Sequence, residues 1–231
     1  MAENTFSATV ELTYREIVMA AVQKDGYALQ FAPTFQEDRE IVMAAVQKDG
    51  YALKYAPTFQ QDKAIVMAAV QKDGSALMVA STFQEDREIV MAAVQQDGSA
   101  LMVARTFQND REIVMTAVKH YGYALHFAPT FQNDREIVMA AVQKDGTAIQ
   151  YSTLCADPEI TCAAIQNTPH ALSFVDSSLD NNNQFIECII KHKVKSIKRP
   201  ELQRHIKDRL SLKMVEKELS DSIKHVVNSY L

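Results

Sequence analysis

The chain has 231 residues, of which 47% are apolar and 23% are charged, and its net charge at pH 7 is −5. This is the composition of a soluble globular protein, and no apolar run approaches the length that crosses a bilayer. The opening segment, MAENTFSATVEL, lacks the basic stretch and apolar core of a Sec signal peptide. We therefore expect neither a transmembrane segment nor a Sec signal peptide.

One segment recurs along the chain with a period of 24 residues. The copy at 39–62 reads REIVMAAVQKDGYALKYAPTFQQD, and the copy at 15–38 differs from it at three positions. Further copies begin at Lys63, Arg87, Arg111 and Arg135, and every glycine of the chain lies in one of the copies. A fixed period of this size is typical of a solenoid.

The first part of each repeat predicts a short helix. In the copy at 39–62, Asp38 is suited to cap the helix start, and Ile41, Val42, Ala45 and Val46 form one wide apolar face. We expect Gly50 to end this helix in the left-handed conformation that glycine tolerates.

A second, shorter helix is predicted over 51–56, and a proline after it in several copies disfavours helical geometry at the preceding residue. In the third and fourth copies Ser81 and Arg105 replace that proline, so there we expect a slightly longer helix. The phenylalanine of each TFQ segment is expected to fill the seam before the next repeat. Because such short helices are marginal alone, stacking must stabilise them. The fold class is therefore all-α, an α-solenoid of 24-residue two-helix repeats with a C-terminal helical cap.

The recurring pattern D-R-E-I-V-x-A-A-V-x-x-x-G-x-A-L-x-x-A resembles the repeat of the domain-of-unknown-function family numbered 4116. The resemblance covers about two thirds of the chain. It implies a helical repeat protein of an intracellular bacterial pathogen, where many members are suspected effectors delivered by type IV secretion into the host cytosol. The family carries no established activity or catalytic residues.

Four regions are expected along the chain. Residues 1–14 form an N-terminal cap, 15–157 six helical repeats, 158–182 a degenerate seventh repeat, and 183–231 a basic C-terminal helical region with one helix starting near Pro200 and a last one over 214–230. Residues 1–182 hold 13 Lys+Arg and 23 Asp+Glu, net −10, whereas residues 183–231 hold 11 and 6, net +5. An acidic array is thus joined to a basic tail.

The three cysteines argue against a disulfide framework and favour a reducing compartment. Cys162 and Cys188 fall on apolar helix faces, where a thiol behaves as a small buried hydrophobe. Cys155 and His170 add further metal-capable atoms, but the CxxC spacing of zinc sites is missing. His120 and His126 lack a third ligand. We expect no metal site, no cofactor and no catalytic constellation.

Aspartates stand directly before five of the glycines. They could form an acidic stripe for a basic partner, or bond locally to the amides that open the second helix, which is the favoured interpretation. The five residues are Asp25, Asp49, Asp73, Asp97 and Asp145.

Side chains that vary between copies cluster on the second helix, as a recognition surface on a constant frame would show. Met78 and Met102 either expose an adaptable apolar patch or fill space left where tyrosine became serine. The residues predicted to bind a partner are Tyr27, Tyr51, Lys54, Met78, Met102 and His126.

The segment KHKVKSIKR is basic enough to contact anionic lipid or nucleic acid, through Lys193, Lys195, Lys198 and Arg199. The acidic array opposes nucleic-acid binding. The sequence therefore favours a non-catalytic interaction scaffold, a secreted bacterial effector that binds a host protein. The alternative is a repeat protein that binds nucleic acid or anionic lipid through its basic C-terminal region.

Overall fold

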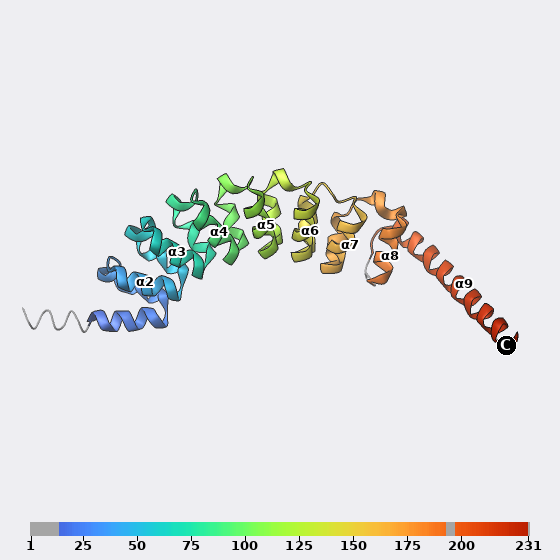
Figure 1. The fold of residues 1–231 in the computed structure, drawn as a ribbon, viewed down its shortest axis with the longest axis horizontal. Helices are drawn as coiled ribbons and strands as arrows, with labels where there is room; N and C mark the ends of the chain where they lie inside the picture. Colours follow the sequence, from blue (N-terminus) through green and yellow to red (C-terminus); the bar gives the residue numbers. More distant parts are fainter. Residues whose placement is uncertain (1–13, 193–196, 231) are drawn as a thin grey trace, which may run out of the picture.

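The computed structural model describes residues 14–192 and 197–230, and all of their regular elements are helical. Successive repeats stack side by side into a curved array, from which a long last helix extends (Figure 1). The predicted α-solenoid is confirmed. The predicted N-terminal cap lies almost entirely outside the described residues.

Each repeat begins with a ten-residue α-helix, and each of these helices packs on the next. A first helix covers 14–24. The labelled helices are α2 (Arg39–Lys48), α3 (Lys63–Lys72), α4 (Arg87–Gln96), α5 (Arg111–His120), α6 (Arg135–Lys144) and α7 (Pro158–Asn167). The predicted apolar face is buried in each of these labelled helices. In α2 its four residues, Ile41, Val42, Ala45 and Val46, are fully buried.

The second helix of each repeat is a 3-10 helix rather than an α-helix. These helices are η1 (Gly26–Phe31), η3 (Gly50–Tyr55), η5 (Gly74–Met78), η7 (Gly98–Met102), η9 (Gly122–Phe127), η11 (Gly146–Tyr151) and η12 (Pro169–Phe174). They stack on one another along the array, and we call the row from η1 to η11 the 3-10 ridge.

The expectation of a longer second helix without proline is wrong. Helices η5 and η7 have five residues, whereas η3 and η9 have six. The chain turns at Ala80 as it does at Ala56, because the amide of the TFQ phenylalanine donates to the carbonyl oxygen of that alanine in both repeats. The turn is therefore fixed by this hydrogen bond, with or without proline.

That turn is itself a short 3-10 helix, namely η2 (Pro33–Phe35), η4 (Pro57–Gln61), η6 (Ser81–Phe83), η8 (Arg105–Phe107) or η10 (Pro129–Phe131). Its phenylalanine packs against the core, as predicted. The glutamine that follows reaches back, and in the third repeat Gln84 Nε2 donates to the carbonyl oxygen of Leu77 at 3.3 Å. The TFQ motif thus closes each repeat with an apolar side chain and a polar one.

The glycines do not have the left-handed conformation predicted for them. Helices α2 to α6 each end in an extended residue, such as Asp97 with φ −141°, and the following glycine is covered by the next repeat. A Cβ on Gly98 would lie 2.2 Å from the carbonyl oxygen of Ala117. Glycine is therefore required because two backbones approach closely.

Ion pairs join each repeat to the next along the starts of the α-helices. Arg87, the first residue of α4, lies 3.1 Å from Asp110 Oδ2 and 2.6 Å from Glu112 Oε2, at the start of α5. The Oδ1 atom of the same Asp110 accepts from the amides of Glu112 and Ile113, which confirms the predicted aspartate cap. Equivalent cations stand at the starts of the other repeats, at Arg15, Arg39, Lys63, Arg111 and Arg135.

The C-terminal region contains η13 (Ser177–Asn181), α8 (Asn183–Lys191) and α9 (Pro200–Tyr230). The two helices predicted after residue 199 are one continuous helix, because nothing in the sequence between them breaks helical geometry. Its start packs on α8 and η13 through the buried Leu202. Among the described residues, none of the helices combines the length and apolar character needed to cross a membrane.

Candidate functional site

The 3-10 ridge carries all six residues predicted to bind a partner. Five of them, Tyr27, Lys54, Met78, Met102 and His126, are exposed, and Tyr51 is half-buried. They lie on η1, η3, η5, η7 and η9, which stack in that order. The structure therefore places residues up to 99 positions apart (126 − 27 = 99) on one continuous surface.

The N-terminal end of the ridge combines aromatic rings with one cation. Lys54 Nζ lies 4.9 Å from the centroid of the Tyr55 ring and 5.5 Å from that of Tyr51. The Tyr27 ring meets that of Tyr55 edge to face, at 6.3 Å between centroids. Such cation–π and edge-to-face contacts hold the side chains in a defined arrangement.

The middle of the ridge is apolar. Met78 is 48% exposed and Met102 is 42% exposed, at equivalent positions of adjacent repeats. Both side chains thus present apolar surface to solvent, as the interpretation of an adaptable apolar patch requires. Methionine side chains are flexible and polarisable, and suit adaptable apolar contacts.

The C-terminal end of the ridge is aromatic again. The Tyr123 ring lies 5.3 Å from that of His126 and 5.0 Å from that of Tyr151. Burial raises the pKa of Tyr151 to about 12, and the hydrogen bond with Tyr123 contributes. Burial also raises the pKa of Tyr27, with help from the charges of Asp73 and Asp49. These phenols stay protonated at neutral pH and present hydrogen-bond donors.

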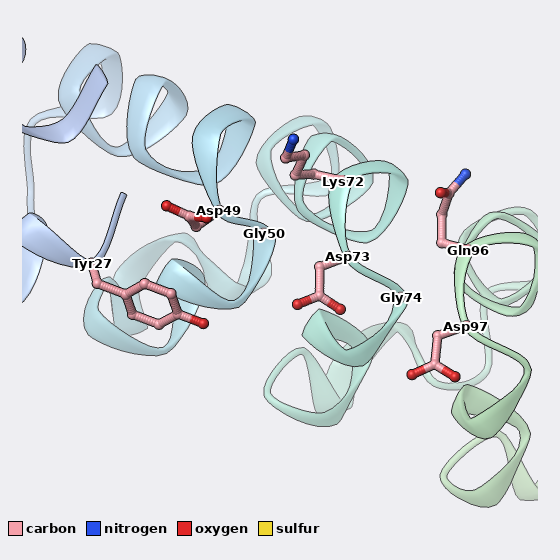
Figure 2. Close-up of a pocket in the computed structure, with 8 residues that line it drawn as sticks. All are labelled: Tyr27, Asp49, Gly50, Lys72, Asp73, Gly74, Gln96 and Asp97. Atoms are coloured by element: carbon pink, nitrogen blue, oxygen red, sulfur yellow. The ribbon is translucent and has the colours of Figure 1, made fainter. Parts of the chain in front are cut away.

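The aspartates before the glycines serve mainly as local caps, as the favoured interpretation predicted. Asp73 Oδ1 accepts from the amide of Ser75 at 2.9 Å, and Asp97 Oδ1 from that of Ser99 at 2.8 Å. Asp49 differs, because its Oδ2 accepts from the amide of Gly26 in the preceding repeat, at 2.7 Å. Figure 2 shows these carboxylates recurring along a shallow pocket of about 250 Å³.

The sequence prediction missed a second surface, formed by the fifth residue of each α-helix. Methionine occupies this position at Met19, Met43, Met67, Met91, Met115 and Met139, all half-buried against the core. A pocket of about 460 Å³ lies between Met115 and Met139. The recurrence of methionine every 24 residues was visible in the sequence, but its partial exposure was not.

The residues predicted to bind anions are only partly described. Lys193 and Lys195 lie outside the described residues, and Lys198 is exposed. Arg199 is mostly buried and lies 2.6 Å from Asp180 Oδ1, in an ion pair that fixes the start of α9. Its guanidinium is therefore already engaged with a carboxylate of the array.

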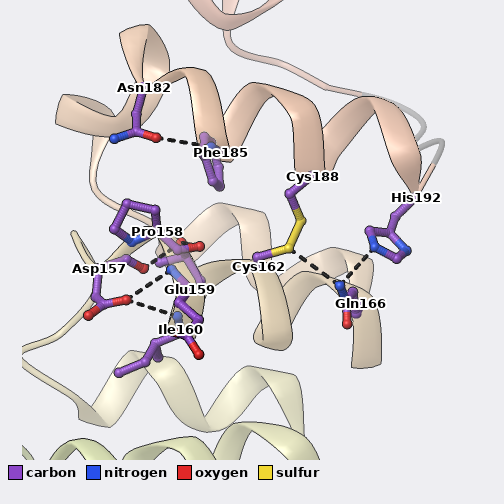
Figure 3. Close-up of a disulfide and its surroundings, with 11 residues drawn as sticks. Asp157, Pro158, Glu159, Ile160, Cys162, Gln166, Asn182, Phe185, Cys188 and His192 are labelled. Carbon is purple, nitrogen blue, oxygen red and sulfur yellow. Dashed lines mark hydrogen bonds between the residues drawn. A yellow bond between two sulfur atoms is a disulfide. The ribbon is translucent and has the colours of Figure 1, made fainter.

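The cysteine prediction is wrong for two of the three residues. Cys162 on α7 and Cys188 on α8 form a disulfide, with their Cα atoms 5.9 Å apart (Figure 3). They are 26 residues apart in sequence, and the stacking of α8 on α7 brings them face to face. Cys155 is a free, half-buried thiol. His170 packs against Phe174.

Comparison with known proteins agrees with the repeat architecture. No curated protein and no solved structure matches the sequence. The family model described as domain of unknown function (DUF4116) matches three consecutive segments, at residues 14–60, 62–106 and 110–153. Each match spans about two 24-residue repeats and together they cover more than half of the 231 residues. The chain therefore belongs to the family of the domain of unknown function DUF4116.

Proposed function

We propose that the array is a non-catalytic scaffold that binds a protein partner along the 3-10 ridge. The observation that carries this proposal is the exposure of Met78 and Met102 on adjacent, nearly identical repeats. Apolar side chains at the centre of a surface, flanked by tyrosines, are typical of protein interfaces.

The opposite ends of the repeats are less suited to recognition. At the starts of the α-helices the charges pair with one another from repeat to repeat, as Arg87 does with Asp110 and Glu112. These pairs recur with little variation and serve the stacking itself. The varied side chains lie on the ridge. At the position of Met78 and Met102 the other repeats have glutamine, lysine or histidine, and at the position of Tyr51 some repeats have serine or threonine.

We further propose that the partner is a host protein and that the chain is a bacterial effector secreted into the host cytosol. The resemblance to repeat proteins of type IV secretion supports this. A fusion of the whole chain to a host-activated reporter enzyme would test it in bacteria with an intact or a disabled type IV system. Equal reporter signal from the two strains would contradict secretion by this route.

Changing Met78 and Met102 together to glutamate should abolish partner binding and leave the array folded. Both side chains reach solvent, at 48% and 42% exposure, so the new carboxylates can stay hydrated in the free array, whereas an interface that covers them must desolvate two charges. Quantitative mass spectrometry of proteins captured from host-cell lysate would measure the effect, with circular dichroism to check folding.

The matched control changes Gln71 and Gln95 to glutamate. These residues are exposed on the α-helices of the same two repeats and add the same charge away from the ridge. Partner capture should then equal that of the wild type. A second control changes Lys193, Lys195 and Lys198 to glutamate and keeps Arg199, because Arg199 pairs with Asp180. Loss of the partner in either control, with retention in the methionine variant, would place the binding surface elsewhere.

A further inference from the structure

Two pairs of side chains face each other between α7 and α8. Cys162 and Gln166 are four residues apart on α7, and Cys188 and His192 are four residues apart at the end of α8. Residues with this spacing lie on one face of a helix. Figure 3 shows both pairs meeting in the space between the two helices, with Gln166 between Cys162 and His192.

The distances within this group are short. Ligand atoms of Cys162, Cys188 and His192 all lie within 4.8 Å of one another. Gln166 Nε2 lies 2.8 Å from His192 Nε2 and 3.4 Å from Cys162 Sγ. The glutamine therefore bridges the imidazole of His192 and the sulfur atom of Cys162.

We propose that, when both thiols are free, Cys162, Cys188 and His192 bind one zinc-class divalent cation. Thiolate and imidazole are the ligands that zinc prefers in proteins, and two thiolates with one imidazole are a known three-ligand zinc set whose fourth position is open. The fourth position is left to water. Binding releases the two thiol protons to solvent, since thiolates are the ligands. The disulfide and the metal exclude each other because they use the same sulfur atoms.

The burial of the group suits a metal site. Cys188 is only 6% exposed and Cys162 is half-buried, whereas His192 and Gln166 are exposed. The sulfur atoms are thus sheltered between the helices, and the imidazole closes the group on the side from which a cation enters. Gln166 Nε2 lies 2.8 Å from His192 Nε2, and this contact is a hydrogen bond in the tautomer whose Nε2 is unprotonated; in that tautomer Nε2 is also the nitrogen that can bind a metal in place of the glutamine.

The position of the group in the array explains why the site occurs once among the described repeats. Cys162 is the fifth residue of α7, where each earlier repeat has methionine, and α8 is the first helix of the C-terminal region. A cation here would fasten α8 to the last repeat. This role is independent of the partner proposed for the ridge.

Cobalt titration of the reduced full-length protein under anaerobic conditions tests the site. We expect one equivalent of Co²⁺ to produce a thiolate-to-cobalt charge-transfer band and the visible absorption of tetrahedral cobalt, and Zn²⁺ to displace it. Cys162→Ser and Cys188→Ser should each remove most of the charge-transfer intensity. His192→Ala should weaken Co²⁺ affinity at least tenfold and, as an exposed residue at a helix end, should leave folding intact.

Two variants serve as matched controls. Cys155→Ser removes the remaining thiol and His170→Ala removes an imidazole of the same repeat that is not part of the group, and both should bind Co²⁺ as the wild type does. The oxidised protein should not give the charge-transfer band. The proposal is overturned if the reduced wild type lacks this band, if Cys155→Ser loses it, or if His192→Ala retains wild-type affinity.

Discussion

Replacing Gly98 with alanine is expected to lower the free energy of unfolding by about 1–3 kcal/mol or more, the usual cost of overpacking a well-packed site. The added Cβ would stand 2.2 Å from the carbonyl oxygen of Ala117 and 2.9 Å from the Cβ of Tyr121. Neither is the end of a flexible side chain, so α5 and η7 must move apart. Urea denaturation followed by circular dichroism would measure the loss.

Two further variants separate this cause from a left-handed helix end. Gly98→Asn would be tolerated better than alanine in a left-handed residue, because asparagine adopts that conformation more readily. If Gly98 is required because the carbonyl oxygen of Ala117 approaches it closely, asparagine should be at least as destabilising as alanine, and this is the expected result. Ser99→Ala, one residue on, is a control that places alanine in the same 3-10 helix without adding a side-chain atom, and it should change stability little. Wild-type stability of Gly98→Ala would contradict the close approach.

Acidification through pH 4 is expected to destabilise the array strongly, because the same carboxylate arrangement recurs in successive repeats. A hydrogen bond from Lys63 lowers the pKa of Asp86. At Asp110 partial burial raises the pKa, but hydrogen bonds from the Ile113 amide and from Arg87 outweigh it and the net pKa is lowered. Asp38, Asp62 and Asp134 have lowered pKa values as well.

The direction of this pH dependence follows from the difference between the pKa values of the folded and unfolded chains. Each of these carboxyls has a lower pKa in the folded chain than in the unfolded chain, so its contribution is fully present above the unfolded value of about 4. It is lost as pH falls through the folded pKa. Denaturation curves between pH 7 and pH 3 should therefore show stability falling steeply below about pH 4.

Asp110→Asn provides the test at one junction. Asparagine still caps the helix through its side-chain oxygen, but it neither titrates nor pairs with Arg87. The variant should be less stable than the wild type at pH 7, and the difference should shrink as pH falls from 4 to 3, because the contribution of Asp110 is lost as pH falls toward its lowered folded pKa. As the control, Glu85→Gln removes one exposed charge from the turn before α4, in the preceding repeat. A difference that persists undiminished at pH 3 would show that the ion pair is not its cause.

Local patterns in the sequence were sufficient to predict much of the fold. The period of 24 residues, the aspartate before each α-helix and the buried face of Ile41 and Val46 depend on interactions within a few residues. The choice of 3-10 over α geometry in the second helix was not predictable, because a six-residue segment carries too few positions to distinguish the two periods.

Features that depend on contacts between repeats were missed or misassigned. The role of Gly98 depends on a carbonyl oxygen 19 residues further along the chain (117 − 98 = 19), and the disulfide depends on how α8 stacks on α7. For the candidate site, the variation between copies was enough to choose six residues that all lie on the 3-10 ridge. Whether Met78 points to solvent or into the core could only be seen once η5 was placed against its neighbours.

The ion pairs between repeats have a direction, and that direction makes the repeats interchangeable. Helices α2 to α6 each begin with a cation that pairs with the aspartate capping the next α-helix, as Arg39 does with Asp62 and Lys63 with Asp86. Removing residues 63–86 as a block would leave Arg39 facing Asp62 and Glu88, a junction of the same kind. The molecule can therefore change its reach in steps of one repeat, with the two ends and their partners unaltered.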